Sequence, residues 1–168
     1  MTLTHARLTQ LFHYDPANGH FTRLLNRCSR TRAGDIAGNE TAQGYLRIGI
    51  DGKEYTCHRL AWFYMTGEWP KDQIDHINGI RTDNRFTNLR EATTAENTRN
   101  GLISKNNTSG FKGVCFHKDT GRWQAKIFIN GKGRHLGLFD TAEAAANAYD
   151  AAAAKLHGEF ARTNQSLR

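Results

Sequence analysis

Cysteine is scarce in this sequence, and no two cysteines lie close together. Cys28, Cys57 and Cys115 are isolated, and their number is odd. The chain therefore lacks the paired C-x-x-C spacing of a structural zinc site. We expect the three thiols to be reduced, as thiols are in the cytosol.

Long apolar segments are also absent. No apolar run approaches the roughly 18 residues that a membrane-spanning helix needs. The first residues, MTLTHARLTQLF, lack the basic-then-apolar order of a secretory signal peptide. We therefore expect a cytoplasmic protein that has no membrane partner.

Acidic residues are outnumbered by basic ones. The 168 residues carry a formal net charge of +7. Residues 105–168 hold 10 lysines and arginines against 5 acidic residues, whereas residues 1–104 hold 13 against 11. A basic surface favours a polyanionic partner, and nucleic acid is the first expectation. The alternative is a basic protein that is merely soluble.

One polar stretch, residues 73–100, carries the strongest functional signal. It reads QIDHINGIRTDNRFTNLREATTAENTRN. A short strand ends at the Asp-His pair, a polar loop follows, and a second strand is expected over 89–92. Thr93 and Glu96 form a capping box, which predicts a helix with Asn97 in its first turn.

The side chains of this stretch suit metal-dependent phosphodiester hydrolysis. Asp75 and the Asn97 carboxamide offer the hard oxygen ligands that Mg²⁺ prefers, and Mg²⁺ usually takes only one or two ligands from the protein. A neutral His76 beside the metal can take a proton from the attacking water. An isolated Asp-His pair would more often form a surface turn, so the assignment depends on the whole pattern.

The pieces D-H-I-N-G, D-N-R, N-L-R and E-N resemble the HNH nucleases, in the branch that includes phage and intron homing endonucleases. The resemblance implies a ββα-metal (His-Me finger) domain in which Asp75 and Asn97 bind the metal and His76 is the general base. Asn88 would hold the loop and help to orient the base. Many members have His where this chain has Asn97, and Asn is common there in the homing branch. Mg²⁺ is the expected ion, Mn²⁺ would fit the same ligands, and no zinc is expected.

The residues before the motif supply further candidates. Residues 26–44 are basic and rich in glycine, so they form a loop that either follows a phosphate backbone or is simply solvated. Three arginines lie close together in it: Arg27, Arg30 and Arg32. A hairpin is expected around Asp51-Gly52, followed by a helix over 58–66. Arg59 in that helix either contacts DNA or packs against its neighbours.

A second recognisable unit fills the last third of the chain. Residues 101–109 are rich in Asn, Ser and Gly and mark a linker. Strands are expected over 111–117, 122–129 and 134–139, and a helix over 141–157. Along the middle strand the apolar residues alternate with Arg122, Gln124, Lys126 and Phe128. The helix would cover the apolar face of the sheet and leave the other face free.

This last third resembles the plant APETALA-type (ethylene-response-factor) DNA-binding domain over about 50 residues. The matching pieces are G-V near its start, L-G-x-F at 136–139, T-A-E-A-A, and A-Y-D in the helix. The resemblance implies that the sheet reads double-stranded DNA. The candidate contacts are Lys112, His117, Arg122, Gln124, Lys126, Arg134 and His135. Cys115 and Phe128 stand where plant members often carry Arg, so the plant target sequence does not carry over.

Together these features predict an α+β protein. Residues 1–100 would form the HNH nuclease domain, 101–109 a linker, and 110–164 an APETALA-type domain with a three-stranded antiparallel sheet packed on one α-helix. The expected function is a homing-type DNA endonuclease, encoded by a phage or mobile element and acting in the cytoplasm of a bacterial host cell. It would leave 5′-phosphate and 3′-hydroxyl ends.

Some alternatives stay open at this stage. A single motif per chain fits either a nick by a monomer or a double-strand break by a homodimer. A DNA-binding transcriptional regulator with a vestigial nuclease domain is the other function to consider. An RNA-binding protein is less favoured, because the pattern lacks the exposed aromatic pairs of common RNA-binding sheets.

Overall fold

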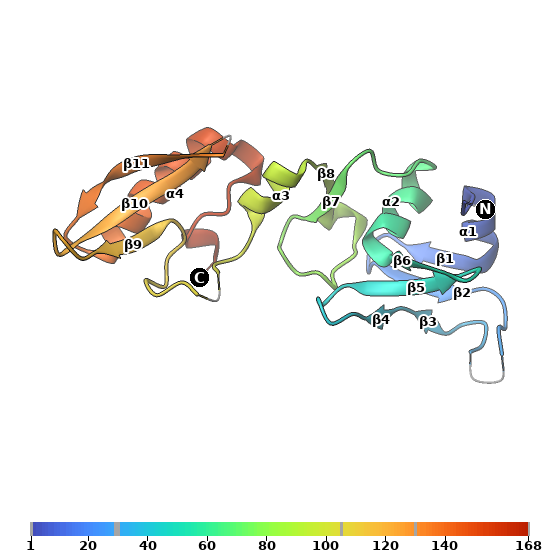
Figure 1. The fold of residues 1–168 in the computed structure, drawn as a ribbon. Helices are drawn as coiled ribbons and strands as arrows, with labels where there is room; N and C mark the ends of the chain where they lie inside the picture. The colour runs from blue at the N-terminus through green and yellow to red at the C-terminus, as the bar shows by residue number, and fades with distance from the viewer. Residues whose placement is uncertain (1, 29–30, 105, 130, 168) are drawn as a thin grey trace. The chain divides into compact units, whose positions relative to one another are not determined.

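Helices and short strands are mixed along the whole chain (Figure 1). The computed structural model describes residues 2–28, 31–104, 106–129 and 131–167. The chain divides into two compact units, residues 1–93 and 94–168. No helix in the described ranges is long and apolar enough to cross a membrane.

The first unit begins with a helix and continues through short strands to the motif. Its elements are α1 (His5–Leu11), β1 (Phe12–Asp15), β2 (His20–Arg23), β3 (Ile36–Ala37), β4 (Asn39–Glu40), β5 (Leu46–Ile50), β6 (Lys53–Thr56), α2 (Cys57–Thr66), β7 (Gln73–His76), the 3₁₀ turn η1 (Phe86–Asn88) and β8 (Leu89–Ala92). They form three antiparallel sheets with the strand orders β1-β2-β3, β4-β5-β6 and β7-β8.

Helix α2 lies at the centre of the first unit's core. Leu60 and Ala61 are fully buried, and the helix contacts α1, β5, β6 and β7. It ends at Gly67, whose φ of +77° is the left-handed conformation that glycine adopts at a helix C-terminus. Helix α2 contacts β7. The apolar residues of this helix therefore fix the position of the strand that ends at His76.

The segment predicted as a loop over 26–44 is partly paired. Its described residues include β3, which pairs with β2, and β4, which pairs with β5. Arg30 lies outside the described residues. Strands of two residues leave no periodic pattern in the sequence, so the pairing depends on the strands that flank them.

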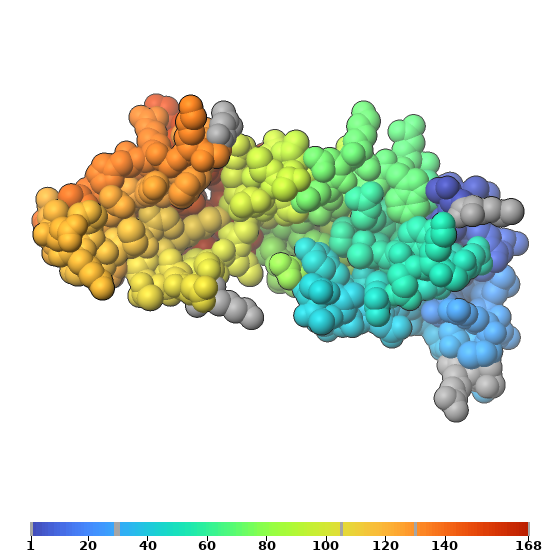
Figure 2. Space-filling view, in the orientation of Figure 1, coloured from blue at the N-terminus to red at the C-terminus, as the bar shows by residue number. Residues whose placement is uncertain are grey.

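The second unit consists of a sheet and a long helix, which form the orange and red part of the surface in Figure 2. Its elements are α3 (Thr94–Asn100), β9 (Val114–His117), β10 (Arg122–Ile129), β11 (Lys132–Phe139), α4 (Ala142–His157) and the 3₁₀ turns η2 (Gly158–Phe160) and η3 (Gln165–Leu167). The strand order is β11-β10-β9, and both pairings are antiparallel. Asn130, predicted to lie in the turn before β11, is outside the described residues.

Helix α4 packs against all three strands and covers one face of the sheet (Figure 1). Ala125 and Ile127 of β10 are buried with Ala145 and Ala153 of the helix. Small alanine side chains let the helix lie close to the sheet. Gly113 shows how close the approach is, because a Cβ there would stand 2.1 Å from the Tyr149 ring.

A buried carboxylate fastens the end of the chain to this helix. Asp150 Oδ1 accepts hydrogen bonds from the backbone N and from Nδ2 of Asn164, at 2.7 and 2.8 Å. The Oδ1 atom of Asn164 in turn accepts the backbone N–H of Lys112 at 2.6 Å. This network satisfies the buried carboxylate and joins α4, the segment before β9 and the C-terminal segment.

Candidate active site and DNA-binding sheet

His76 is the last residue of β7, and several of its neighbours come from the β7–β8 hairpin and the loop between the two strands. His76 lies opposite Leu89, and Asp75 lies opposite Arg90. Asp75, His76 and Asn88 are all buried, with exposed fractions of 4%, 5% and 8%. The structure therefore brings three of the four predicted nuclease residues together within the first unit. The fourth, Asn97, is half-buried on α3 in the second unit.

The Asp75 carboxylate is paired with a cation. Arg90 donates from Nε and from Nη2 to Asp75 Oδ2, at 2.9 and 2.8 Å. Both side chains are largely buried, with exposed fractions of 13% for Arg90 and 4% for Asp75. A buried carboxylate needs such partners to remain charged, and the two bonds fix the direction in which it points.

Asn84 orients His76, a role that the sequence analysis did not predict for this residue. The distance from His76 Nε2 to Asn84 Oδ1 is 3.2 Å, and Asn84 is 1% exposed. An amide oxygen can only accept, so Nε2 carries the proton and the neutral ring keeps its lone pair on Nδ1. Burial lowers the pKa of His76, while the bond to Asn84 and the charge of Asp75 oppose that shift. The ring is therefore neutral at neutral pH.

Asn88 holds the loop that carries Asn84. Its Oδ1 atom accepts the backbone N–H of Asn78 at 3.0 Å, and its Nδ2 donates to Asn78 Oδ1 at 3.0 Å and to the Asp83 carbonyl at 2.8 Å. The loop-holding role predicted for Asn88 agrees with these contacts. Asn84 makes an orienting contact to the base.

The β1–β2 hairpin supports the same loop from outside. The Tyr14 hydroxyl donates to the Asn84 carbonyl at 2.7 Å, and the Phe86 N–H donates to the Pro16 carbonyl at 3.1 Å. A Cβ on Gly19 would stand 2.5 Å from the backbone of both Asn84 and Arg85. The backbone that carries Asn84 is thus fixed by an element about 70 residues earlier in the sequence.

His58 packs beside His76 in the core of the site. Their ring centroids are 5.1 Å apart, and Tyr45 lies 5.1 Å from His58 and 6.1 Å from His76. The buried Nδ1 of His58 has no hydrogen-bond partner among the described residues. Burial lowers the pKa of His58 to about 3, so this ring is also neutral. A buried, neutral histidine of this kind packs within the core of the site.

The arginines predicted in the first unit differ in their surroundings. Arg27 and Arg32 are exposed, which suits either a phosphate contact or a solvated face. Arg59 is half-buried and donates from Nη1 to the Asp72 carbonyl at 2.9 Å. Their DNA contacts stay predictions.

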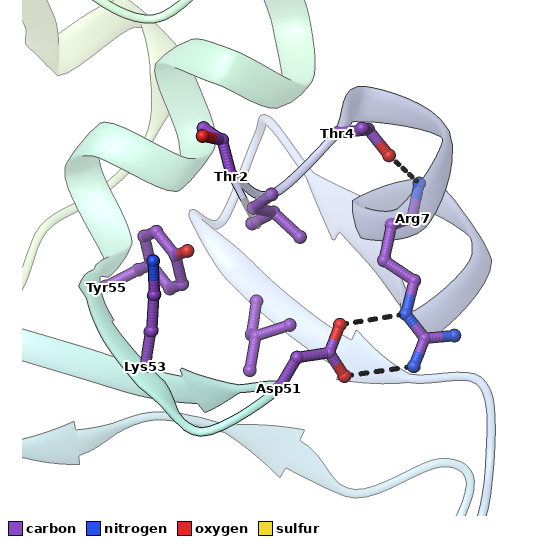
Figure 3. Close-up of a pocket in the computed structure, with 8 residues that line it drawn as sticks. Thr2, Thr4, Arg7, Asp51, Lys53 and Tyr55 are labelled. Carbon is purple, nitrogen blue, oxygen red and sulfur yellow. Dashed lines mark hydrogen bonds and ion pairs between the residues drawn. The ribbon is translucent and has the colours of Figure 1, made fainter.

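A hollow of about 580 Å³ lies elsewhere in the first unit, between α1 and the β5–β6 turn (Figure 3). Arg7 crosses its rim and donates to both carboxylate oxygens of Asp51, at 3.0 Å each. His76 does not line this hollow. The ion pair holds α1 against the predicted Asp51-Gly52 turn, so it has a structural explanation.

The free face of the second unit's sheet carries most of the DNA contacts that are predicted for this unit. Cross-strand partners point to the same side of a sheet. Arg122 lies opposite His117, and Lys126 lies opposite His135. Gln124 contacts His135 across the sheet, with 3.2 Å between Nε2 and Nδ1. The predicted contacts that lie on this face are therefore His117, Arg122, Gln124, Lys126 and His135.

Arg134 does not share this face. The register shifts between Ala125, which lies opposite Gly137, and Lys126, which lies opposite His135, so Leu136 is the extra residue of a β-bulge. Arg134 lies opposite Ile127, whose side chain is buried against α4. The bulge reverses the alternation of β11 and turns Arg134 to the helix side. Its DNA contact stays a prediction, and the register does not place it with the other candidates.

Lys112, a predicted DNA contact, binds backbone carbonyl groups within the second unit. Its Nζ donates to the carbonyl oxygens of Arg99 and Gly101 at 2.6 and 2.7 Å. Burial lowers its pKa to about 8. An ammonium group suits the last carbonyls of a helix, and here it fastens the end of α3 to the sheet unit. We therefore leave Lys112 out of the proposed contact set.

Known protein families match the two parts of the chain separately. The HNH endonuclease model matches residues 55–99, and the AP2 domain model matches residues 109–159. Protein 3.8 of Escherichia phage T7 is 36% identical over 106 residues, which is 62% of this chain and 87% of that protein. The HNH endonuclease L560 of Acanthamoeba polyphaga mimivirus is 33% identical over 120 residues, or 70% of this chain and 62% of that protein.

Plant proteins match the second part. The APETALA2-like protein 2 of Oryza sativa subsp. indica is 48% identical over 73 residues, which is 44% of this chain. The chain spans only 16% of that plant protein. The region matched by the HNH model contains Asp75, His76, Asn84 and Asn88, and the AP2 region contains the whole sheet. The chain therefore carries an HNH endonuclease domain followed by an AP2 domain.

Proposed function

We propose that this protein is a metal-dependent DNA endonuclease of the homing type, with His76 as the general base. The observation that carries the proposal is the setting of His76. The imidazole is buried and neutral, its Nε2 is committed to Asn84, and Asp75, which is paired with Arg90 of β8, precedes it on β7. A base prepared in this way is what water activation at neutral pH requires.

The reaction follows from that setting. Nδ1 of His76 takes a proton from a water molecule, and the water oxygen bonds to phosphorus. The bond from phosphorus to the 3′ oxygen then breaks, which leaves a 5′-phosphate and a 3′-hydroxyl. The leaving oxygen gains a proton, and His76 later releases its own to solvent. Asn84 keeps the ring in the productive tautomer throughout.

A divalent metal ion completes the proposal. The Asp75 carboxylate is a hard oxygen donor held in place by Arg90, and the sequence pattern adds the Asn97 carboxamide. Such donors fit Mg²⁺, with Mn²⁺ as the substitute, because Mg²⁺ takes few ligands from the protein. Among the residues that the structure describes, no three His, Cys, Asp or Glu side chains cluster as a metal cage. When bound, the ion would polarise the phosphate and stabilise the leaving oxygen.

The AP2 domain would place the nuclease on its site. We assign residues 1–100 to the HNH domain, 101–109 to the linker and 110–164 to the AP2 domain. Its sheet would enter the major groove of double-stranded DNA with His117, Arg122, Gln124, Lys126 and His135. We further propose that the protein is phage-encoded, as its T7 relative is, and acts in the host cytoplasm.

Supercoiled plasmid and phage DNA test this function. The protein is incubated with each DNA in Mg²⁺, in Mn²⁺ and in EDTA, and the products are analysed for strand breaks and end groups. Nicked or linear product in Mg²⁺, with 5′-phosphate ends and no product in EDTA, is expected. Nicked product alone would favour a monomer, and linear product from the first minutes would favour a dimer. Tight binding without cleavage of any DNA would favour the regulator with a vestigial nuclease domain.

A further inference from the structure

One large apolar side chain lies exposed on the free face of the AP2 sheet. Phe128 of β10 is 60% exposed, and it lies two residues after Lys126 on the same side of the strand. The buried residues Ala125 and Ile127 point to the opposite side, toward α4. A single exposed phenylalanine is common on protein surfaces, so a partner is inferred from what surrounds the ring.

The surroundings of this ring select the kind of partner. The sequence of the three strands contains Arg122, Lys126, Lys132 and Arg134 and no acidic residue. Lys126 places its ammonium 5.1 Å from the centre of the Phe128 ring, which is a cation–π contact. A partner that covers the ring therefore meets positive charge beside it, as a nucleic acid would.

The sheet has a second exposed phenylalanine, but this one lies on the other face. Phe116 of β9 is 49% exposed, but it lies opposite Trp123, and their rings are 5.2 Å apart. It therefore belongs to the side that α4 covers. The two rings do not form the pair on one face that stacks the bases of single-stranded RNA.

Duplex DNA offers one apolar group to a ring in its major groove. That group is the C5 methyl of thymine, while the other groove edges present hydrogen-bond donors and acceptors. We propose that Phe128 contacts the C5 methyl group of a thymine and so sets a thymine preference at one position of the target site. The proposal rests on the proposed function, because it requires the sheet to lie in the major groove.

Deoxyuridine tests the contact directly, because it lacks only the methyl group and still pairs with adenine. A target duplex is first enriched from random DNA with the wild-type protein in EDTA, which prevents cleavage. Each thymine of that duplex is then replaced by deoxyuridine in turn, and the Kd is measured for each duplex. At one position the wild type should bind the uracil duplex about fourfold more weakly, the order expected for one buried methyl group.

Two variants give the comparison its meaning. Phe128→Ala should bind the thymine and uracil duplexes equally, and Phe116→Ala should keep the wild-type difference. Equal affinity of the wild type for all uracil duplexes, or a Phe128→Ala variant with the wild-type difference, would overturn the proposal. The Lys126→Ala variant distinguishes a failure of the thymine contact from a failure of the proposed DNA binding by the sheet. If Lys126→Ala weakens binding while uracil has no effect, only the thymine contact is wrong. If Lys126→Ala changes nothing, sheet binding and the thymine contact fall together.

Discussion

A buried amide helps to orient His76. Asn84 accepts from His76 Nε2, and its own Nδ2 donates to the Thr82 carbonyl at 3.3 Å, which sets which end of the amide faces the histidine. Loss of that acceptor removes the hydrogen bond that favours the proton on Nε2. Asn84 is therefore a positioning residue that acts through His76.

Substitution of Asn84 tests this role. Asn84→Ala should lower the cleavage rate by at least tenfold, within the roughly 10²–10⁴-fold that a general base contributes, while the affinity for DNA stays unchanged. Asn84→Asp keeps an acceptor and adds a negative charge, which raises the pKa of His76. As the pH is lowered, the cleavage rate of this variant should therefore begin to fall at a higher pH than the rate of the wild type. A wild-type rate in Asn84→Ala would contradict the role.

His58 predicts how stability depends on pH. Its pKa is about 3 in the folded protein because the ring is buried, and it is about 6.5 in an unfolded chain. Between these values the unfolded state binds a proton that the folded state does not, so the free energy of unfolding falls as the pH is lowered from about 7. His58→Phe should reduce this slope by about 1 kcal/mol per pH unit between pH 6 and 4 in urea denaturation. An unchanged slope would mean that the ring is protonated within the fold.

The sequence predicts part of this site and misses part of it. Asp75, His76 and Asn88 stand out because their spacing is unusual and their side chains suit the chemistry. Asn84 lies in the D-N-R piece of the same pattern, yet local chemistry marks it only as a turn residue. Its contact with His76 spans eight residues and depends on the path of the loop, which Asn88 and Tyr14 determine. No local pattern encodes that path.

At the scale of elements, the β1–β2 hairpin acts as a support for the motif loop. Gly19 and Gly52 have nearly the same backbone conformation, with φ of +77° and +79°. A Cβ on Gly19 meets the backbone of Asn84 and Arg85 at 2.5 Å, whereas a Cβ on Gly52 meets nothing within 4 Å. The two positions thus separate backbone strain from displacement of the loop.

Alanine at these glycines should give different results. Gly52→Ala should cost about 1–2 kcal/mol of stability, the penalty of a left-handed conformation, and leave cleavage intact. Gly19→Ala should cost more and should also slow cleavage, because the loop must move away with Asn84. Thermal unfolding and plasmid cleavage measure the two effects. Equal losses in both variants would show that the hairpin does not support the loop.

Elements with many residues in a regular pattern are the ones that the sequence predicts well. The alternation along β10 indicates the buried set, and Ala125 and Ile127 are indeed buried. The Asp51-Gly52 turn has positive φ at both residues, as a type I′ turn requires. The bulge at Leu136 has no such signature, and it places His135, instead of Arg134, on the free face. Gly137, with φ of +143°, is a hint that becomes readable only with the register known.

For the whole molecule, net charge predicts how DNA binding responds to salt. The chain carries +7, and phosphate contacts release counterions when they form. Affinity should therefore fall linearly in a plot of log Kobs against log salt. Lys126→Ala should make this slope shallower by about 0.9, the value for one lost phosphate contact. Lys155→Ala removes the same charge from an exposed position on α4 and should leave the slope unchanged. Equal slopes for both variants would place the DNA elsewhere.

The two-part organisation is visible in the sequence because each part carries its own motif. The division by contacts differs in detail. Helix α3 groups with the second unit, where Lys112 holds its C-terminal carbonyls, although the HNH model extends over it to residue 99. A boundary drawn from composition follows the polar segment after this helix. The contacts of Lys112, by contrast, are made across eleven to thirteen residues and leave no local signal.

The central claim is that His76 is the base of a DNA-cutting reaction. The most direct measurement compares wild type, His76→Ala and His13→Ala on supercoiled plasmid in Mg²⁺, with DNA affinity measured for the same samples in EDTA. His13 is an exposed histidine on β1 and controls for loss of a histidine. We expect cleavage by wild type and His13→Ala, no detectable cleavage by His76→Ala, and equal affinity in all three. Cleavage by His76→Ala at the wild-type rate would contradict it.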